Sequence, residues 1–296
     1  MMGLGSIFQP EIPAGAYDAF AGPARKRAAA RQPWTPTDGR MPALFISHGA
    51  PPLLDDADWL HRLFEWAQRL PQPFAILIGS AHWESAPLAL SSPAASTTPV
   101  YDFGGFAPRY YTLRYDTPDA TALASLVRSV LPAGQQPHEH LDRGLDHGAW
   151  VPLMAMYPNA DVPVLQLSLP TEDPATLLEL GRRLQTLRDH GVLIIGSGFM
   201  THGLPFLTQK IILGEELPSW SQEFDHWATE ALGRGDVETL CDYRSTAPGM
   251  PYAHPSVDHF IPLFITLGAA SHSDARITPV IDGYWMGLAR TSFEVA

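Results

Sequence analysis

Histidines that follow short apolar runs are the residues of this sequence best suited to chemistry. His48 comes directly after the expected strand 43–47, and His82 follows the apolar run 74–78 across three small residues. His202 follows a third apolar run, 192–195, in a loop that begins Gly-Ser-Gly. Ligands of open α/β sheets bind beyond the carboxyl ends of the strands, where these imidazoles would meet. One such histidine is more often a core residue bonded to a carbonyl, but the repetition favours a metal site.

A pair of histidines near the end of the chain offers a further ligand. His254 and His259 flank Ser256, which we expect to cap a helix over 256–268 with His259 in its first turn. A charged imidazole is disfavoured at a helix N-terminus, whereas a neutral imidazole bound to metal is not. This placement favours His259 as a ligand. Two or three neutral imidazoles, with or without a carboxylate, suit Zn(II) or Fe(II).

Two other segments have a functional and a purely structural interpretation. His147 lies beside Asp146, but neighbours in a regular element usually point apart, so that pairing is weak. Residues 101–111 hold five aromatic side chains, two glycines and Arg109. They predict either a packed irregular loop or an aromatic wall over a substrate pocket, and the sequence favours neither.

The elements that must position these residues alternate between strands and helices. Apolar runs predict buried strands over 43–47, 74–78, 162–169 and 191–195. Helical spacing and capping residues predict helices over 53–70, 118–130, 173–189, 219–232 and 256–268. The turn Gly196-Ser-Gly198 lacks the three-glycine spacing and the following acidic residue of a dinucleotide site, so we reject that interpretation.

Composition limits the class of protein. The net charge of -12 argues against nucleic acid and anionic membranes as partners, and no apolar run approaches the length of a membrane span. A single cysteine, Cys241, excludes a disulfide framework and fits a reducing cytoplasm. Residues 1–40 are rich in Ala, Gly and Pro and predict an extension, partly ordered at best, that packs on the domain or on a second subunit. We place the domain at 41–296 and expect it to fold without the extension.

The motifs together resemble the LigB-like class III extradiol ring-cleavage dioxygenases, in particular the DOPA dioxygenase branch. The resemblance spans residues 41–296 in order. It rests on His48-Gly-Ala-Pro51, Ser80-Ala-His-Trp83, Tyr101-Asp-Phe-Gly-Gly-Phe106, Gly144-Leu-Asp-His-Gly-Ala-Trp-Val-Pro-Leu153, Gly196-Ser-Gly198 with His202, and His254-Pro-Ser-Val-Asp-His-Phe260.

The resemblance implies a single-domain three-layer α/β/α fold with a central, mostly parallel sheet, and a mononuclear metal. Fe(II) would serve turnover, and Zn(II) would be found in the purified protein. The metal ligands by position are His48, His82 and His259, where the wider superfamily has a glutamate instead of the third histidine. His202 matches the acid–base histidine and His147 a second active-site histidine.

The implied reaction is cleavage of a small aromatic diol, of the DOPA-like catechol type, by O₂ to a muconic semialdehyde. Tyr111, Arg109 and His254 are the expected substrate-binding residues, with Arg109 or Arg114 meeting a substrate carboxylate.

Two alternatives stay open. A zinc hydrolase would use the same three histidines to activate water, with His202 as the base. A non-catalytic metal-binding protein would use His202 as a fourth ligand that closes a tetrahedral site. The sequence does not decide whether the protein is a homo-oligomer.

Overall fold

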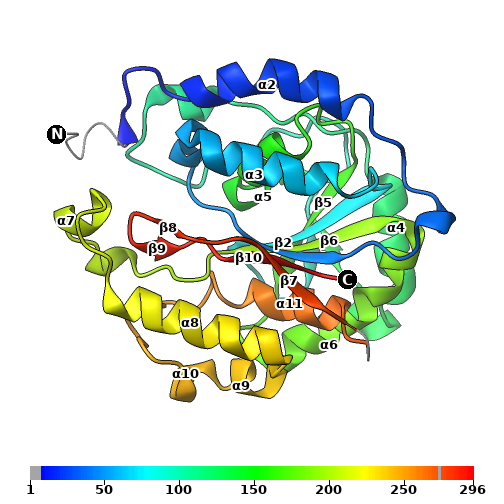
Figure 1. The fold of residues 1–296 in the computed structure, drawn as a ribbon. Helices are drawn as coiled ribbons and strands as arrows, with labels where there is room; N and C mark the ends of the chain where they lie inside the picture. The colour runs from blue at the N-terminus through cyan, green and yellow to red at the C-terminus, as the bar shows by residue number, and fades with distance from the viewer. Residues whose placement is uncertain (1–7, 273–274) are drawn as a thin grey trace.

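In the computed structural model, which describes residues 8–272 and 275–296, an eight-stranded sheet forms the centre of the molecule (Figure 1). The strands lie in the order β4-β3-β5-β2-β6-β1-β10-β7. The four central strands are parallel to one another, and antiparallel pairs occur toward both edges. Their bounds are Ala43–Ser47 (β1), Ala75–Glu84 (β2), Ala89–Leu90 (β3), His138–Glu139 (β4), Val164–Leu169 (β5), Val192–Gly198 (β6), Ile277–Ile281 (β7) and Ser292–Val295 (β10).

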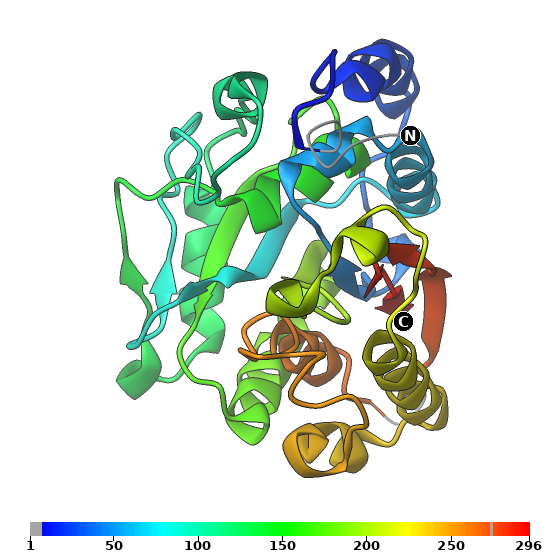
Figure 2. The ribbon, with the colours of Figure 1, turned by 90° about the vertical axis from the view of Figure 1, so that its left-hand side faces the viewer.

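Helices cover both faces of the sheet, as Figures 1 and 2 show from two directions. Side chains alternate along each strand, so Leu44 and Ile46 belong to one core and Phe45 to the other. The first core includes α2 (Gly15–Ala28), α3 (Ala57–Gln68) and α5 (His147–Met156). The second includes α4 (Thr121–Val130), α6 (Pro174–Leu184), α8 (Ser219–Arg234) and α11 (Pro262–Ala269). The expected three-layer α/β/α domain with a mostly parallel sheet is confirmed.

Smaller elements complete the chain. They are the helices α7 (Gln209–Ile212), α9 (Val237–Cys241) and α10 (Tyr243–Thr246), and the two-stranded sheet of β8 (Tyr284–Trp285) and β9 (Leu288–Ala289). Segment 101–111 carries a single 3₁₀ turn at its end and is otherwise irregular.

Several element boundaries differ from the sequence prediction for local reasons. Strand β2 continues to Glu84, so His82 lies within the strand and not after it. The helix expected over 53–70 is a 3₁₀ turn over 51–55 followed by α3, because the side chain of Asp56 caps the amide of Trp59 at 3.0 Å. The helix expected over 173–189 ends at Leu184 and continues as a 3₁₀ turn.

The largest correction concerns the last helix. Residues 255–261 form bends and turns, and α11 begins only at Pro262, so His259 is not in its first turn. A helix from Ser256 would place Pro262 in its interior, where proline removes a hydrogen bond and clashes with the preceding turn. At the start of a helix the missing N–H costs nothing. The helix-terminus argument for His259 is therefore wrong.

The described part of the N-terminal segment, residues 8–40, is packed on the domain. Helix α2 buries Tyr17 and Phe20, and the Phe20 ring meets the Phe64 ring of α3 at 5.6 Å between centroids. This segment is therefore more ordered than the sequence indicated. The boundary at residue 41 stays a prediction, and the buried aromatics lead us to expect a less stable protein when residues 1–40 are removed.

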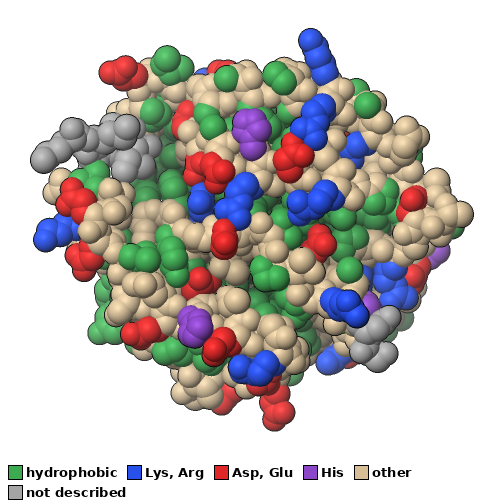
Figure 3. All heavy atoms as spheres, viewed as in Figure 1, with side chains coloured by type: hydrophobic (Ala, Val, Ile, Leu, Met, Phe, Trp, Pro, Cys, Tyr) green, Lys and Arg blue, Asp and Glu red, His purple; other side chains and the backbone are tan. Residues whose placement is uncertain are grey.

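The described residues contain no helix long and apolar enough to cross a membrane. On the face drawn in Figure 3, basic and acidic side chains are interspersed.

Candidate active site

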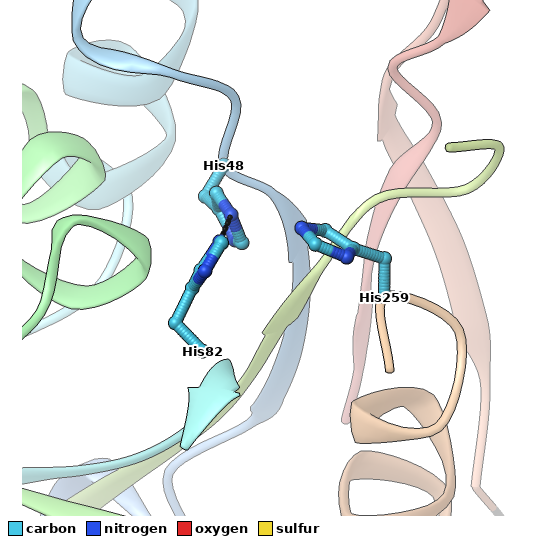
Figure 4. Close-up of side chains that lie close together, drawn as sticks. All are labelled: His48, His82 and His259. Atoms are coloured by element: carbon cyan, nitrogen blue, oxygen red, sulfur yellow. Dashed lines mark hydrogen bonds between the residues drawn. The ribbon is translucent and has the colours of Figure 1, made fainter. Parts of the chain in front are cut away.

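His48 and His82 lie together at the carboxyl ends of two strands that flank β6. His48 follows β1 and donates its backbone N–H to the carbonyl of Gly198 at 2.9 Å. Its Nε2 lies 3.1 Å from Nε2 of His82, and Figure 4 shows the two side chains pointing toward each other. Gly148 permits this approach, since a Cβ there would lie 3.1 Å from both rings and 2.3 Å from the Ser80 hydroxyl. The strand-end arrangement expected from the sequence thus brings the two imidazoles into contact.

His259 reaches the same point from the turn before α11 (Figure 4). Its carbonyl accepts the N–H of Phe199 at 2.9 Å, which ties the turn to the end of β6. Only glycine fits at position 198, because a Cβ there would lie 2.0 Å from that carbonyl oxygen. The ligand-type atoms of His48, His82 and His259 all lie within 4.8 Å of one another. The three predicted metal ligands are therefore adjacent, although the third arrives from a turn and not from a helix.

The second ring nitrogen of each of these histidines has a partner. Nδ1 of His48 lies 2.9 Å from the Ser197 hydroxyl, which gives its own proton to the Gly148 carbonyl and so accepts from the ring. Nδ1 of His82 lies 3.3 Å from a carboxylate oxygen of Asp102, and Nδ1 of His259 contacts the carboxylate of Asp258. Such partners fix the tautomer of metal-binding histidines. They leave three Nε2 lone pairs that converge.

The donor set fits a divalent metal. Metal–imidazole bonds of about 2.0–2.1 Å place two nitrogens on one ion roughly 3.0–3.4 Å apart, and His48 and His82 already have that spacing at 3.1 Å. Three neutral imidazoles are a donor set for Zn(II) or Fe(II).

Burial keeps these imidazoles neutral. It lowers the pKa of His82 to about 3, and it holds the pKa values of His48 and His259 well below the ordinary value, with the neighbouring histidines adding to the effect. Unprotonated rings are ready to bind a cation at neutral pH.

Asp102 links the metal-type histidines to His147. Its carboxylate lies 2.8 Å from Nδ1 of His147, the first residue of α5, and it also approaches His82. Asp146 has other partners, because its buried carboxylate accepts from Ser80 and Gln166. Sequence reasoning missed Asp102. The only signal was its place inside the aromatic segment, where an acidic residue between Tyr101 and Phe103 is the exception.

His202 stacks on the ring of His259, with centroids 3.4 Å apart and planes inclined by 15°. Its backbone N–H is held by the carbonyl of Ala253 at 2.7 Å. Burial lowers its pKa to about 4, so it is neutral at pH 7. Its ligand-type atoms group with those of Asp258 and His259.

All five histidines border one cavity of about 560 Å³. Its walls are otherwise mainly apolar. Phe103, Phe106 and Phe199 line it, together with Leu204, Leu207, Ile212, Trp285, Met286 and Leu288, and with Phe8 from the N-terminal segment. The aromatic segment therefore contributes to a wall of the cavity while remaining an irregular loop.

Three residues expected to bind substrate do not line this cavity. Arg109 is exposed and pairs with Asp18 at 3.3 Å. Tyr111 packs on Phe103 with centroids 4.8 Å apart. His254 is buried between aromatic rings, and its Nε2 lies 2.9 Å from the Met200 carbonyl. Their assignment as substrate contacts stays a prediction, without geometric support from the described residues.

Comparison with known proteins extends these observations. Residues 43–287 match the family model described as the catalytic LigB subunit of aromatic ring-opening dioxygenase. A 4,5-DOPA dioxygenase extradiol of Beta vulgaris is 38% identical over 260 residues, covering 84% of this chain and 94% of the relative. The protein of that name from Escherichia coli K12 is 34% identical, covering 84% and 92%. A crystal structure of an uncharacterized Escherichia coli K12 protein superposes with a TM-score of 0.70 at 29% identity, covering 87% of this chain and all of that one.

Proposed function

The chain belongs to the LigB family of aromatic ring-opening dioxygenases, and from this premise we propose that it cleaves a catechol next to its diol to give a muconic semialdehyde. In such a reaction the bond between a hydroxylated carbon and its unhydroxylated neighbour breaks. Both atoms of O₂ enter the product, one carbon becoming a carboxylate and the other an aldehyde, so no external reductant is consumed. The relatives named for DOPA make L-DOPA the first substrate to test.

One observation carries the proposal: three neutral imidazoles converge, each with its second nitrogen already bonded. The enzyme is metal-dependent, and we propose His48, His82 and His259 as the ligands. A divalent metal held there would supply Lewis acidity toward the catechol oxygens and, as Fe(II), redox chemistry toward O₂. We propose Fe(II) as the working metal, and Zn(II) as an ion that the same donor set retains during purification.

His202 is our candidate for the acid–base residue. It borders the cavity beside His259, and its depressed pKa leaves it free to accept a hydroxyl proton from a bound catechol. The same ring then returns that proton to the product. Proton transfer of this kind needs no change in the three ligands.

His147 is our candidate for orienting the substrate. Its Nδ1 is committed to Asp102, so its Nε2 is available to hydrogen-bond a substrate oxygen. Asp102 fixes that tautomer while it also contacts His82. One carboxylate thus holds both a ligand and a substrate-facing ring in place.

The alternatives raised by the sequence are not favoured. Family and relatives are named as dioxygenases, and neither a zinc hydrolase nor a non-catalytic metal-binding protein gains support from them. We further propose a cytoplasmic protein, on the strength of its single cysteine. Size-exclusion chromatography with light scattering decides whether it is a homo-oligomer.

Oxygen uptake after reconstitution tests the proposal. Metal-free protein is loaded anaerobically with Fe(II), mixed with a panel of catechols that includes L-DOPA, and then exposed to air. We expect uptake of one O₂ per catechol together with a yellow semialdehyde, and no uptake by the Zn(II)-loaded control. Absence of uptake with every catechol under Fe(II) would contradict the proposed function.

A further inference from the structure

The charge of the cavity lining is the feature that the proposed function leaves unused. Apart from the histidines, Asp102 is the one ionisable side chain among the described residues that line the cavity. Its carboxylate already contacts His82 and His147. The described lining therefore contains no lysine or arginine. Residues 1–7, which precede Phe8, contain none in sequence.

Lys210 is close in sequence to the lining, but it is exposed and does not itself line the cavity. The nearby arginines have acidic partners outside the lining. Arg109, three residues after Phe106, pairs with Asp18 at 3.3 Å. Arg290, two residues after Leu288, pairs with Asp56 at 2.8 Å. Neither is available to a ligand without breaking its ion pair.

A carboxylate on the ring substituent finds no cationic side chain in the described lining, and the proposed metal would be met by the catechol oxygens. Removing an ionised carboxylate from water without a counter-charge is strongly unfavourable, whereas an alkyl or aryl group gains from contact with apolar walls. The net charge of -12 adds long-range repulsion toward anions. The lining also includes Gly104, Gly105 and Trp285, whose N–H groups are uncharged donors.

We infer that the cavity selects catechols with an uncharged, apolar ring substituent over catechols that carry a carboxylate, such as the amino acid L-DOPA. The inference rests on the proposed function and narrows its substrate class. Phe8 extends the apolar wall from outside the family match. Its ring lies 5.8 Å from that of Phe106, and its carbonyl accepts the N–H of Ala107 at 3.2 Å.

Binding to the Zn(II)-loaded protein, for which we expect no turnover, tests the inference directly. The probes are 4-propylcatechol and 3-(3,4-dihydroxyphenyl)propanoate, which have similar side chains but differ in charge, with L-DOPA as a third ligand. Calorimetry should give a dissociation constant at least about tenfold lower for 4-propylcatechol. Equal or tighter binding of the carboxylates, for instance to the glycine amides, overturns the inference. Failure of all three to bind overturns the proposed function itself.

Adding a cation to the lining tests the cause. Leu204 lines the cavity and is 48% exposed, so we expect Leu204→Arg to leave the core undisturbed. We expect it to shift the ratio of the two dissociation constants toward the carboxylate by about tenfold or more. Leu217 is similarly exposed and outside the lining, so Leu217→Arg is the matched control and should leave the ratio unchanged.

A second variant tests how much the apolar wall contributes to the ratio of the two dissociation constants. Phe8→Ala should weaken binding of 4-propylcatechol several-fold and leave the propanoate unaffected. An unchanged ratio in Leu204→Arg and in Phe8→Ala would show that the lining does not set the preference.

Discussion

His259 in the histidine cluster of the active site and His254 in a neighbouring aromatic core lie five residues apart in sequence. Their imidazoles have different surroundings. His259 is buried beside two other histidines, with Nδ1 on a carboxylate and Nε2 free. His254 is equally buried, but its ring packs on Phe224 and Phe260 with centroids 4.9 and 5.3 Å away. Its Nε2 faces the carbonyl of Met200, and its Nδ1 has no hydrogen-bond partner among the described residues.

The comparison separates burial from function. Burial lowers the pKa of both rings, so a depressed pKa does not tell a ligand from a core residue. The difference lies in what holds the second nitrogen and in where the remaining lone pair points. An imidazole whose Nδ1 is bonded to an acceptor, and whose Nε2 points toward other imidazoles, is arranged to bind a cation.

His202 extends the comparison to a third environment, in which a half-buried ring borders the cavity without joining the three-histidine group. We expect His202→Ala to keep one metal per chain and to lower the turnover number by about 10²–10⁴, since only proton transfer is lost. Metal analysis and oxygen uptake on the same sample measure both quantities. A variant that purifies without metal would make His202 a ligand.

Asp102→Asn replaces the carboxylate that contacts His82 and His147 by an uncharged amide. Loss of such a partner typically lowers metal affinity by about 10–100-fold, and we expect that range here. Competition with a chelating indicator gives the dissociation constant for Zn(II). Asp116→Asn is the matched control, because Asp116 is an exposed acid that pairs with Arg114 and lies outside the cavity lining. Equal affinities in the two variants would remove Asp102 from the account.

The smallest expected effect concerns acid stability. His254 has a folded pKa of about 3 against an ordinary value near 6.5, so the unfolded chain binds more protons. The stability that its neutral form provides is full above about pH 6.5 and is lost as the pH falls toward 3, at up to roughly 1.4 kcal/mol per pH unit.

His254→Phe retains the aromatic packing and removes that titration. Urea unfolding of the metal-loaded proteins between pH 7 and 4.5 should show a shallower decline for the variant, by about one proton. Parallel curves would mean that the folded and unfolded chains bind the same number of protons at His254, so that its pKa is not lowered in the folded protein.

Apolar runs and capping residues predicted the four central strands and five of the helices, because these are local signals. The layered fold and the role of His147 came from the resemblance to the family. Most of the failures lie where tertiary contacts decide, and one has a local cause. The effect of Pro262 on the last helix was overlooked, although proline is a local signal. Asp102 could not be recognised, because its partners are 20 and 45 residues away along the chain. The order of residues 8–40 depends on packing against α3, which composition does not reveal.

The metal content of two matched variants tests the central claim most directly. His259→Ala and His254→Ala each remove one buried imidazole, and differ only in whether it belongs to the converging three. After reconstitution with Zn(II) or Fe(II) and gel filtration, we expect His254→Ala to hold about one metal ion per folded chain and His259→Ala to hold almost none. Circular dichroism confirms that both are folded. A metal-free His254→Ala beside a metal-loaded His259→Ala would contradict the account.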